Sequence, residues 1–437
     1  MTPPSEPRPR RRPTEHLRAL AIRSREVVLI SAAIGAVSGF GVLACERIFN
    51  EGLLDAILGA PLAVQIGAPF LGLVLTALAL RYVAGGASAA TTDVYIQALP
   101  EPTAPFPMRP YFGKLLAAFT TLGFGGSAGY EGPSIYLGAG VGAEAHNRLS
   151  RRIPGLDRHV LLAAGAAAGV AAIFKAPITG AVFALEVPFE DDVAPRALLP
   201  ALIGAASGYL AYAAVAGTAP LIPVSGTAPL DGRDIAAAAA IGLICGAGAR
   251  VYAFLVGLAK RAQETVSPMV RAVAGGAFLS LLVVVSHAAF DGEPLSMGPG
   301  YHAIAWAIDP KRSLTLIALL ALIRLFGTVV TLGAGAGGLF VPLVVEGALV
   351  GRLIAGITGG PQSLFVVVGI AAFLGAGYRV PLAAVVFVAE ATGRPGFIVP
   401  GLIAAVIAQL VMADASVTSY QRPRPVSASD LGEPDTS

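Results

Sequence analysis

Charged side chains are scarce in this chain of 437 residues. Only 13% of its residues are Asp, Glu, Lys or Arg, whereas soluble domains average about 25%. Hydrophobic residues make up 55% of the chain, and they gather in repeated runs long enough to span a bilayer. This composition excludes an ordinary soluble protein. It predicts an all-α integral membrane protein that crosses the bilayer many times.

Cysteine and histidine are also rare. The two cysteines, Cys45 and Cys245, both lie in apolar runs, which excludes a disulfide framework and gives no thiolate cluster for a metal. The five histidines show no spacing typical of metal ligands. The apolar segments hold no pair of nucleophile and base. We therefore expect no enzyme activity, no cofactor and no metal site.

Glycine and proline are abundant instead. The chain has 53 Gly and 33 Pro, about a fifth of its residues, against a usual share of roughly 12%. In a helical membrane protein this excess indicates helices that are interrupted and helices that pack closely. The expected architecture is a bundle of many tilted and broken helices.

Charge is unevenly placed along the chain. Residues 1–26 form a Pro- and Arg-rich tail, which we expect to be disordered and, by the positive-inside rule, cytoplasmic. Membrane lipid is the expected partner of such a basic segment, and nucleic acid is not. The transmembrane domain is assigned to residues 27–413, in two halves of about 27–215 and 235–413. A polar tail, residues 414–437, offers no room for a regulatory domain.

One stretch in the middle of apolar sequence carries a lone carboxylate. Residues 125–138, GGSAGYEGPSIYLG, place Glu131 among glycines and just before Pro133. A charge near the bilayer centre costs roughly 2.5–3.5 kcal/mol on insertion scales, so such a residue is a functional candidate. Glycine lets the backbone break, and proline suits the first turn of a helix. The stretch predicts a broken membrane helix whose free N–H groups point at an anion.

The two halves contain the same ordered pattern. Residues 174–186, FKAPITGAVFALE, match residues 378–390, YRVPLAAVVFVAE, in their aromatic, cationic, proline and Val-Phe positions. We expect the glutamates that end these blocks, Glu186 and Glu390, to be structural and to hold helix ends or backbone at the breaks.

A second pair of blocks precedes the first. Gly129-x-x-x-Pro133 matches Gly338-x-x-x-Pro342, and small residues follow both at equal distances. A repeat with broken helices at matching positions predicts a transport site near the middle of the membrane.

The broken helices define an expected anion site. Two helix N-termini, at Glu131–Gly132 and Leu339–Phe340, are expected to converge from opposite repeats. Each carries roughly half a positive charge from its dipole, so backbone N–H groups can bind an anion without trapping it. The Glu131 carboxylate is expected to occupy the same site until protonation frees it. Burial favours its protonated form and the helix N-terminus its ionised form, and the sequence leaves this balance open.

These motifs resemble those of the CLC family of chloride channels and chloride/proton exchangers. GYEGP at residues 129–133 is similar to the family's G-(K/R)-E-G-P motif, GLFVP at residues 338–342 to its G-x-F-x-P motif, and FKAP at residues 174–177 to its F-N-A-P turn. The resemblance covers about residues 27–413. It implies an inverted-repeat fold, Glu131 as the gate, a homodimer with one pore per subunit, and both termini in the cytoplasm.

Several positions depart from the family pattern. The first anion motif, G-S-G-I-P, falls by spacing on residues 89–93, AATTD, so the anion-binding serine is missing at Ala90 or replaced by Thr91. Val187 stands where the exchangers carry an internal proton glutamate. The pore tyrosine has no counterpart in register, and its candidates are Val417, Thr418 and the nearby Tyr420. The expected anion-binding set is Glu131, Gly132, Leu339, Phe340, Ala90, Thr91, Thr418 and Tyr420.

The sequence therefore predicts transmembrane transport of chloride or a similar small anion through a pore gated by Glu131. Val187 favours a channel or a loosely coupled carrier, but proton coupling stays open because a proton can travel through water. The alternative is a fluoride/proton antiporter, or a carrier of another anion with the same fold, because the serine and tyrosine positions diverge. The expected location is the cell inner membrane or plasma membrane, as a multi-pass protein.

Overall fold

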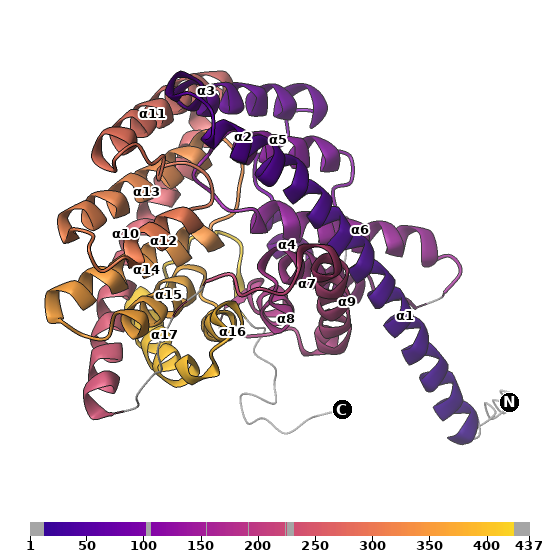
Figure 1. Ribbon diagram of the computed structural model, residues 1–437. Helices are drawn as coiled ribbons and strands as arrows, with labels where there is room; N and C mark the ends of the chain where they lie inside the picture. The colour runs from indigo at the N-terminus through magenta and orange to yellow at the C-terminus, as the bar shows by residue number, and fades with distance from the viewer. Residues whose placement is uncertain are drawn as a thin grey trace, which may run out of the picture.

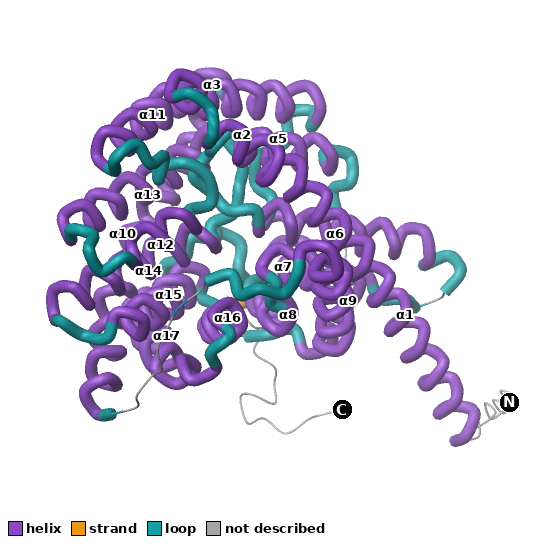
Figure 2. Tube along the Cα trace, in the orientation of Figure 1, coloured by secondary structure: helices purple, strands orange, loops and turns teal. Residues whose placement is uncertain are grey.

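The protein is a bundle of helices in which non-helical segments cross the centre (Figures 1 and 2). The computed structural model describes residues 13–101, 106–153, 155–190, 192–222, 224 and 231–423, with side chains from residue 25 onward. Residues 1–12 and 424–437, which belong to the predicted tails, lie outside the described residues.

The elements of the first half are α1 (Pro13–Glu46), the π-helix η1 (Arg47–Leu54), α2 (Asp55–Leu58), α3 (Leu62–Leu78), the π-helix η2 (Ala79–Val83), α4 (Thr92–Ala98), α5 (Tyr111–Gly123), α6 (Glu131–Leu149), α7 (Arg158–Phe174), α8 (Pro177–Glu186), β1 (Phe189–Glu190), the 3-10 turn η3 (Pro195–Ala197) and α9 (Leu198–Ala216). Those of the second half are α10 (Gly232–Thr265), α11 (Pro268–Ala289), α12 (Tyr301–Ile308), α13 (Leu314–Ala334), α14 (Phe340–Thr358), α15 (Gln362–Tyr378), α16 (Pro381–Thr392), the 3-10 turn η4 (Pro395–Phe397), α17 (Ile398–Met412) and β2 (Arg422–Pro423). β1 and β2 pair in parallel and tie the end of the described chain to the first half.

Eight helices of the described chain are long and apolar enough to cross a membrane. The all-α membrane architecture predicted from the composition is confirmed. Several shorter helices, such as α8 and α16, are mostly buried, although Ile178 and Leu382 in their first turns are about half exposed. Figure 2 shows loops between helices at the centre of the molecule.

The two halves follow the same order of elements. α1 and α10 each have 34 residues, α6 and α14 each have 19, and α7 and α15 each have 17. Gly129 and Gly338, the matched glycines of the repeat, form an isolated antiparallel bridge. The corresponding segments therefore meet while running in opposite directions, as an inverted repeat requires.

Glycine brings the matched helices into backbone contact. A Cβ atom on Gly138 of α6 would lie 1.9 Å from the carbonyl oxygen of Gly165 on α7. In the second half, a Cβ atom on Gly347 of α14 would lie 2.4 Å from the carbonyl oxygen of Gly369 on α15. Only glycine allows this approach, which gives van der Waals packing over the whole contact. The small residues that repeat in the sequence are thus the ones that fix the core of each half.

One expectation about local structure was wrong. The tail expected to be disordered over residues 1–26 is helical from Pro13 onward, because no further proline or glycine occurs before Gly35 and the intervening residues include good helix formers. One helix, α12, was not predicted. With 8 residues, α12 is too short to show as a membrane span in the sequence.

Candidate functional site

The two broken helices meet at the centre of the molecule. The N–H of Gly129 donates to the carbonyl oxygen of Gly338 at 2.9 Å, and the N–H of Gly338 donates back to Gly129 at 2.8 Å. α6 begins two residues after Gly129 and α14 two residues after Gly338. The predicted convergence of the two N-termini is confirmed, and their free N–H groups share one buried region.

Glu131 lies in this region with its carboxylate on the opposite helix. Its side chain is 1% exposed, and its Oε1 accepts a hydrogen bond from the backbone N–H of Phe340 at 2.5 Å. Its Oε2 is buried without a hydrogen-bond partner. The carboxylate thus occupies the N-terminus of α14, which is the place that the sequence predicts for a bound anion.

Glycine makes room for this carboxylate. A Cβ atom on Gly129 would lie 1.9 Å from Oε2 of Glu131, and one on Gly338 would lie 2.1 Å from Oε1. Any side chain at either position would displace the carboxylate. The glycines of both motifs therefore shape the pocket as well as breaking the helices.

The hydroxyl of Tyr378 reaches the amide next to Phe340. It accepts a hydrogen bond from the N–H of Leu339 at 3.3 Å, and its ring, 1% exposed, packs edge-on against Phe183. A tyrosine hydroxyl that accepts a bond still has a proton to donate. The tyrosine at the amides is therefore Tyr378, at the end of α15, and not Tyr420, whose side chain is 47% exposed.

Tyr378 was not predicted as a site residue, although the repeat carried a signal for it. Tyr378 aligns with Phe174, so the two matched positions differ by one hydroxyl in otherwise apolar surroundings. In the structure the ring of Phe340 packs against Phe174 at 4.3 Å, and against Phe183 and Phe387, which are also matched positions of the repeat. Of these matched aromatic residues, Tyr378 alone brings a polar atom to the site.

Thr91 lies against the start of α6. Its side chain is 2% exposed, its hydroxyl has no hydrogen-bond partner, and a Cβ atom on Gly132 would lie 2.9 Å from Oγ1. Ala90 has no polar side-chain atom. Its backbone carbonyl accepts a hydrogen bond from the Nζ of Lys114 at 2.8 Å. The buried ammonium of Lys114, also unnoticed in the sequence, thus holds the segment that positions Thr91.

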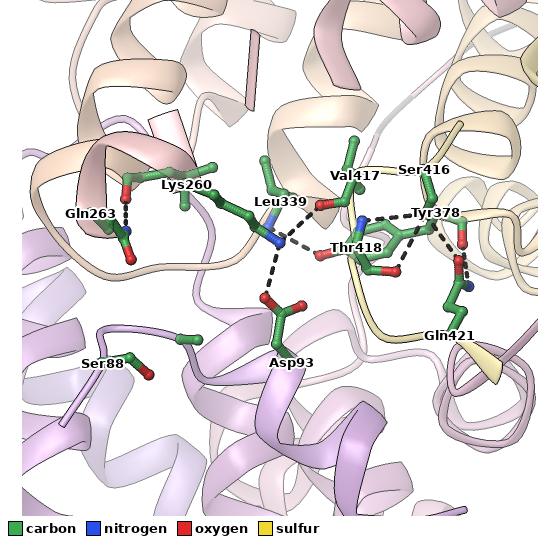
Figure 3. Close-up of polar contacts among 12 residues, drawn as sticks. Ser88, Asp93, Lys260, Gln263, Leu339, Tyr378, Ser416, Val417, Thr418 and Gln421 are labelled. Carbon is green, nitrogen blue, oxygen red and sulfur yellow. Dashed lines mark hydrogen bonds and ion pairs between the residues drawn. The ribbon is translucent and has the colours of Figure 1, made fainter. Parts of the chain in front are cut away.

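A vestibule of about 780 Å³ opens beside the site. It is lined by Thr91, Leu339 and Tyr378 at its inner end, and also by Thr418 and Tyr420. Thr418 is held by Ser416, whose hydroxyl accepts from the Thr418 N–H at 3.2 Å, as Figure 3 shows. The structure therefore places Thr418 and Tyr420 along the approach to the amides.

The paired glutamates cap the opposite repeat. Glu186, at the end of α8, accepts hydrogen bonds from the N–H groups of Leu382 and Ala383 in the first turn of α16, at 3.1 and 2.8 Å. Glu390 of α16 accepts from the N–H groups of Ile178 and Thr179 in the first turn of α8, at 3.0 and 2.7 Å. Their expected structural role is confirmed, since each satisfies N–H groups that a helix N-terminus leaves unpaired.

Such a bundle, with two antiparallel repeats and amide groups directed into a buried pocket, defines an inverted-repeat membrane transport protein that binds anions. The family model described as voltage gated chloride channel matches residues 71–413. The chain belongs to this family, whose members transport anions across membranes and are not enzymes.

The relatives found include transporters of two kinds. The chain is 28% identical over 320 residues to the H(+)/Cl(-) exchange transporter ClcA of Citrobacter koseri, an alignment that covers 68% of this chain and 64% of that protein. The crystal structure of a CLC-type fluoride/proton antiporter superimposes with a TM-score of 0.77 and 24% identity, over 92% of this chain and 99% of the other. A slow cyanobacterial Cl-/H+ antiporter gives a TM-score of 0.78 and 20% identity, over 88% and 94%.

Proposed function

We propose that this protein transports chloride or a similar small anion through a pore in which Glu131 is the gate. The observation that carries the proposal is the hydrogen bond from the Phe340 N–H to the Glu131 carboxylate. A carboxylate and a small anion compete for the same N–H groups, so the site is closed while Glu131 is ionised and bound. Protonation weakens this bond, because charge-assisted hydrogen bonds are about twice as strong as neutral ones.

The anion that replaces the carboxylate has several donors within the pocket. The amides of Leu339 and Phe340 lie at the start of α14, the hydroxyl proton of Tyr378 is available, and the hydroxyl of Thr91 has no other partner. We propose these four groups as the anion-binding set. All are uncharged, which suits an ion that must also leave.

The direct test is anion efflux from liposomes that contain E131Q. Glutamine keeps the size of the side chain and cannot ionise, so we expect faster efflux at neutral pH and loss of the acceleration that acid gives to the wild type. E144Q is the matched control, because Glu144 lies on the same helix, is solvent-accessible and pairs with Arg148. A pH dependence in E131Q equal to that of the wild type would refute Glu131 as the gate.

Fluoride/proton antiport is the second candidate. It is favoured by the absence of a serine at Ala90 and by the divergent tyrosine position, since both depart from the chloride pattern. The chain spans 64% of the length of the first curated relative, so the activities in the relatives' names remain proposals for it. Competition among chloride, nitrate and fluoride in the same liposomes separates the candidates.

Proton coupling and assembly are proposed on the family pattern. A reversal potential that shifts when a proton gradient is imposed indicates exchange, and one set by the anion gradient alone indicates a channel.

We propose a homodimer with one pore per subunit. Sedimentation in mild detergent tests this, because the protein mass should be twice the chain mass of 44.1 kDa.

The vestibule is proposed to face the cytoplasm. α1 and α3 belong to consecutive candidate spans, so the end of the second span near Val83 lies on the same side as the start of α1. Arg81 and other cations line the vestibule at that end, and the positive-inside rule assigns such a face to the cytoplasm.

A further inference from the structure

An ion pair crosses the vestibule. Oδ2 of Asp93, in the first turn of α4, lies 2.9 Å from Nζ of Lys260 on α10, and the same ammonium donates to the carbonyl of Val417 at 3.0 Å. Figure 3 shows the Lys260 side chain reaching between Asp93 and Val417. Three segments that are distant in the sequence thus meet at one cation.

This pair lies on the approach to the amides. Asp93 and Lys260 line the same vestibule as Leu339 and Tyr378. Asp93 follows Thr91 by two residues, so the pair stands next to the proposed anion-binding hydroxyl. An anion that enters from the vestibule meets the pair before it reaches Leu339.

The pair is open enough to exchange partners. The side chain of Lys260 is 27% exposed and that of Asp93 is 12% exposed. An ammonium group has three N–H donors, of which the two contacts above use two. Partly solvated pairs of this kind are held weakly and respond to competing ions.

Two hydroxyl groups beside the pair lack partners. Oγ1 of Thr91 and Oγ1 of Thr92 are buried without a hydrogen bond, and both residues line the vestibule. Buried hydroxyl groups in proteins nearly always have a partner. A small anion held at Lys260 would supply an acceptor for such donors.

We propose that Lys260 is a second anion-binding residue, in the vestibule, and that Asp93 occupies it in the absence of an anion. The proposal rests on the proposed transport function. A small monovalent anion displaces the Asp93 carboxylate, binds the ammonium, and moves on to the Leu339 amide and the Tyr378 hydroxyl. On this route two carboxylates each occupy an anion-binding group until an anion replaces them. Glu131 occupies the Phe340 amide, and Asp93 occupies the Lys260 ammonium.

The experiment measures the half-saturating concentration of chloride, and separately of fluoride, for efflux from liposomes. D93N removes the competing charge at constant size, and we expect the half-saturating concentration to fall about two- to fivefold, which lies within the range for one partly exposed charge interaction. K260Q removes the binding cation, and we expect a rise of about the same size. R81Q is the matched control, because Arg81 lines the same vestibule and the substitution changes its charge equally; we expect a change below about twofold.

The outcomes separate the two proposals. If the wild type carries no small anion, the transport function itself fails. If the wild type transports and E131Q behaves as expected, but D93N matches the wild type or shifts in the same direction as K260Q, the pair is only structural and this inference is refuted. Equal effects of K260Q and R81Q would also refute it, because they would reflect vestibule charge alone. If K260Q is not monodisperse in detergent, D93N decides the question.

Discussion

Backbone N–H groups of Glu131, Phe340 and Val341 interact with the Glu131 carboxylate, and that of Phe340 donates to it at 2.5 Å. A carboxylate in water would have several partners, so burial at this position is unfavourable unless the helix N-terminus compensates for it. Burial and the N–H donors thus act in opposite directions on the ionised Glu131 side chain. A change in its protonation would shift that balance, as the proposed gate requires.

The Tyr378 hydroxyl gives a prediction at the same scale. Y378F removes the group that meets the Leu339 N–H, and we expect anion affinity to fall about three- to tenfold, as for loss of one hydrogen bond worth about 0.5–1.5 kcal/mol. Isothermal titration of the purified protein with chloride and with fluoride measures the change.

Y95F is the control for that experiment. The hydroxyl of Tyr95 is also fully buried and donates to the carbonyl of Ala184 at 2.7 Å. It should therefore show a similar loss of stability with unchanged anion affinity. Equal affinities for Y378F and the wild type would remove Tyr378 from the binding set.

The site residues that could be predicted from the sequence are those whose chemistry conflicts with their surroundings. Glu131 is a charge in apolar sequence, and Phe340 lies in a glycine-rich break, so both stand out along the chain. Tyr378 and Lys260 do not, because an aromatic residue or a lysine at a helix end is ordinary. Their roles depend on contacts with Leu339 and Asp93 across the fold, and the order of residues does not specify those contacts.

At the scale of helices, the exchanged caps bind the halves together. The α8 and α16 helices are short, so each depends on the carboxylate that the other provides. We expect E390A to lower the free energy of unfolding by about 1–3 kcal/mol, since the N–H groups of Ile178 and Thr179 lose their acceptor. Thermal unfolding in detergent measures this, and the exposed E144A on α6 should change it by less than about 0.5 kcal/mol.

Close helix packing gives a second prediction at this scale. G138A places a methyl group 1.9 Å from a backbone oxygen of α7, so α6 must move away and stability should fall by about 1–3 kcal/mol. G67A is the matched control, because Gly67 lies inside α3 with nothing within 4 Å of an added Cβ atom. G67A should be neutral or slightly stabilising. Equal melting temperatures for both variants would contradict the packing argument.

At the scale of the whole molecule, the repeat could be predicted and its exact boundaries could not. Matching blocks at residues 174–186 and 378–390 identify two similar halves, and their glycines and prolines mark the breaks. The helical start of α1 and the short α12 were not predicted. Residues 13–26 are too rich in charged residues, and the 8 residues of α12 are too few, to show as a membrane span in the sequence. Helix ends at such places are set by local capping and by contacts with other helices.

The orientation of the molecule is open to test. Tyr82 lies at the end of the second span on the vestibule side, and its side chain is 71% exposed. We expect Y82C to react with a membrane-impermeant maleimide in inverted vesicles and not in spheroplasts. E293C, beyond the far end of α11, should show the reverse, since α11 starts at the vestibule with Pro268. Labelling of Y82C from outside the cell would overturn the proposed cytoplasmic vestibule.

The bridge between Gly129 and Gly338 has a consequence for how ions can move. Two backbone hydrogen bonds join the halves beside the proposed anion site, so tilting the halves apart there would break both bonds. The proposed route needs only the movement of acidic side chains between helices that stay in place. Side-chain rotation takes picoseconds to nanoseconds when unhindered, whereas domain closure takes microseconds to milliseconds. If transport follows the proposed route, its turnover should not wait for a rearrangement of the helices.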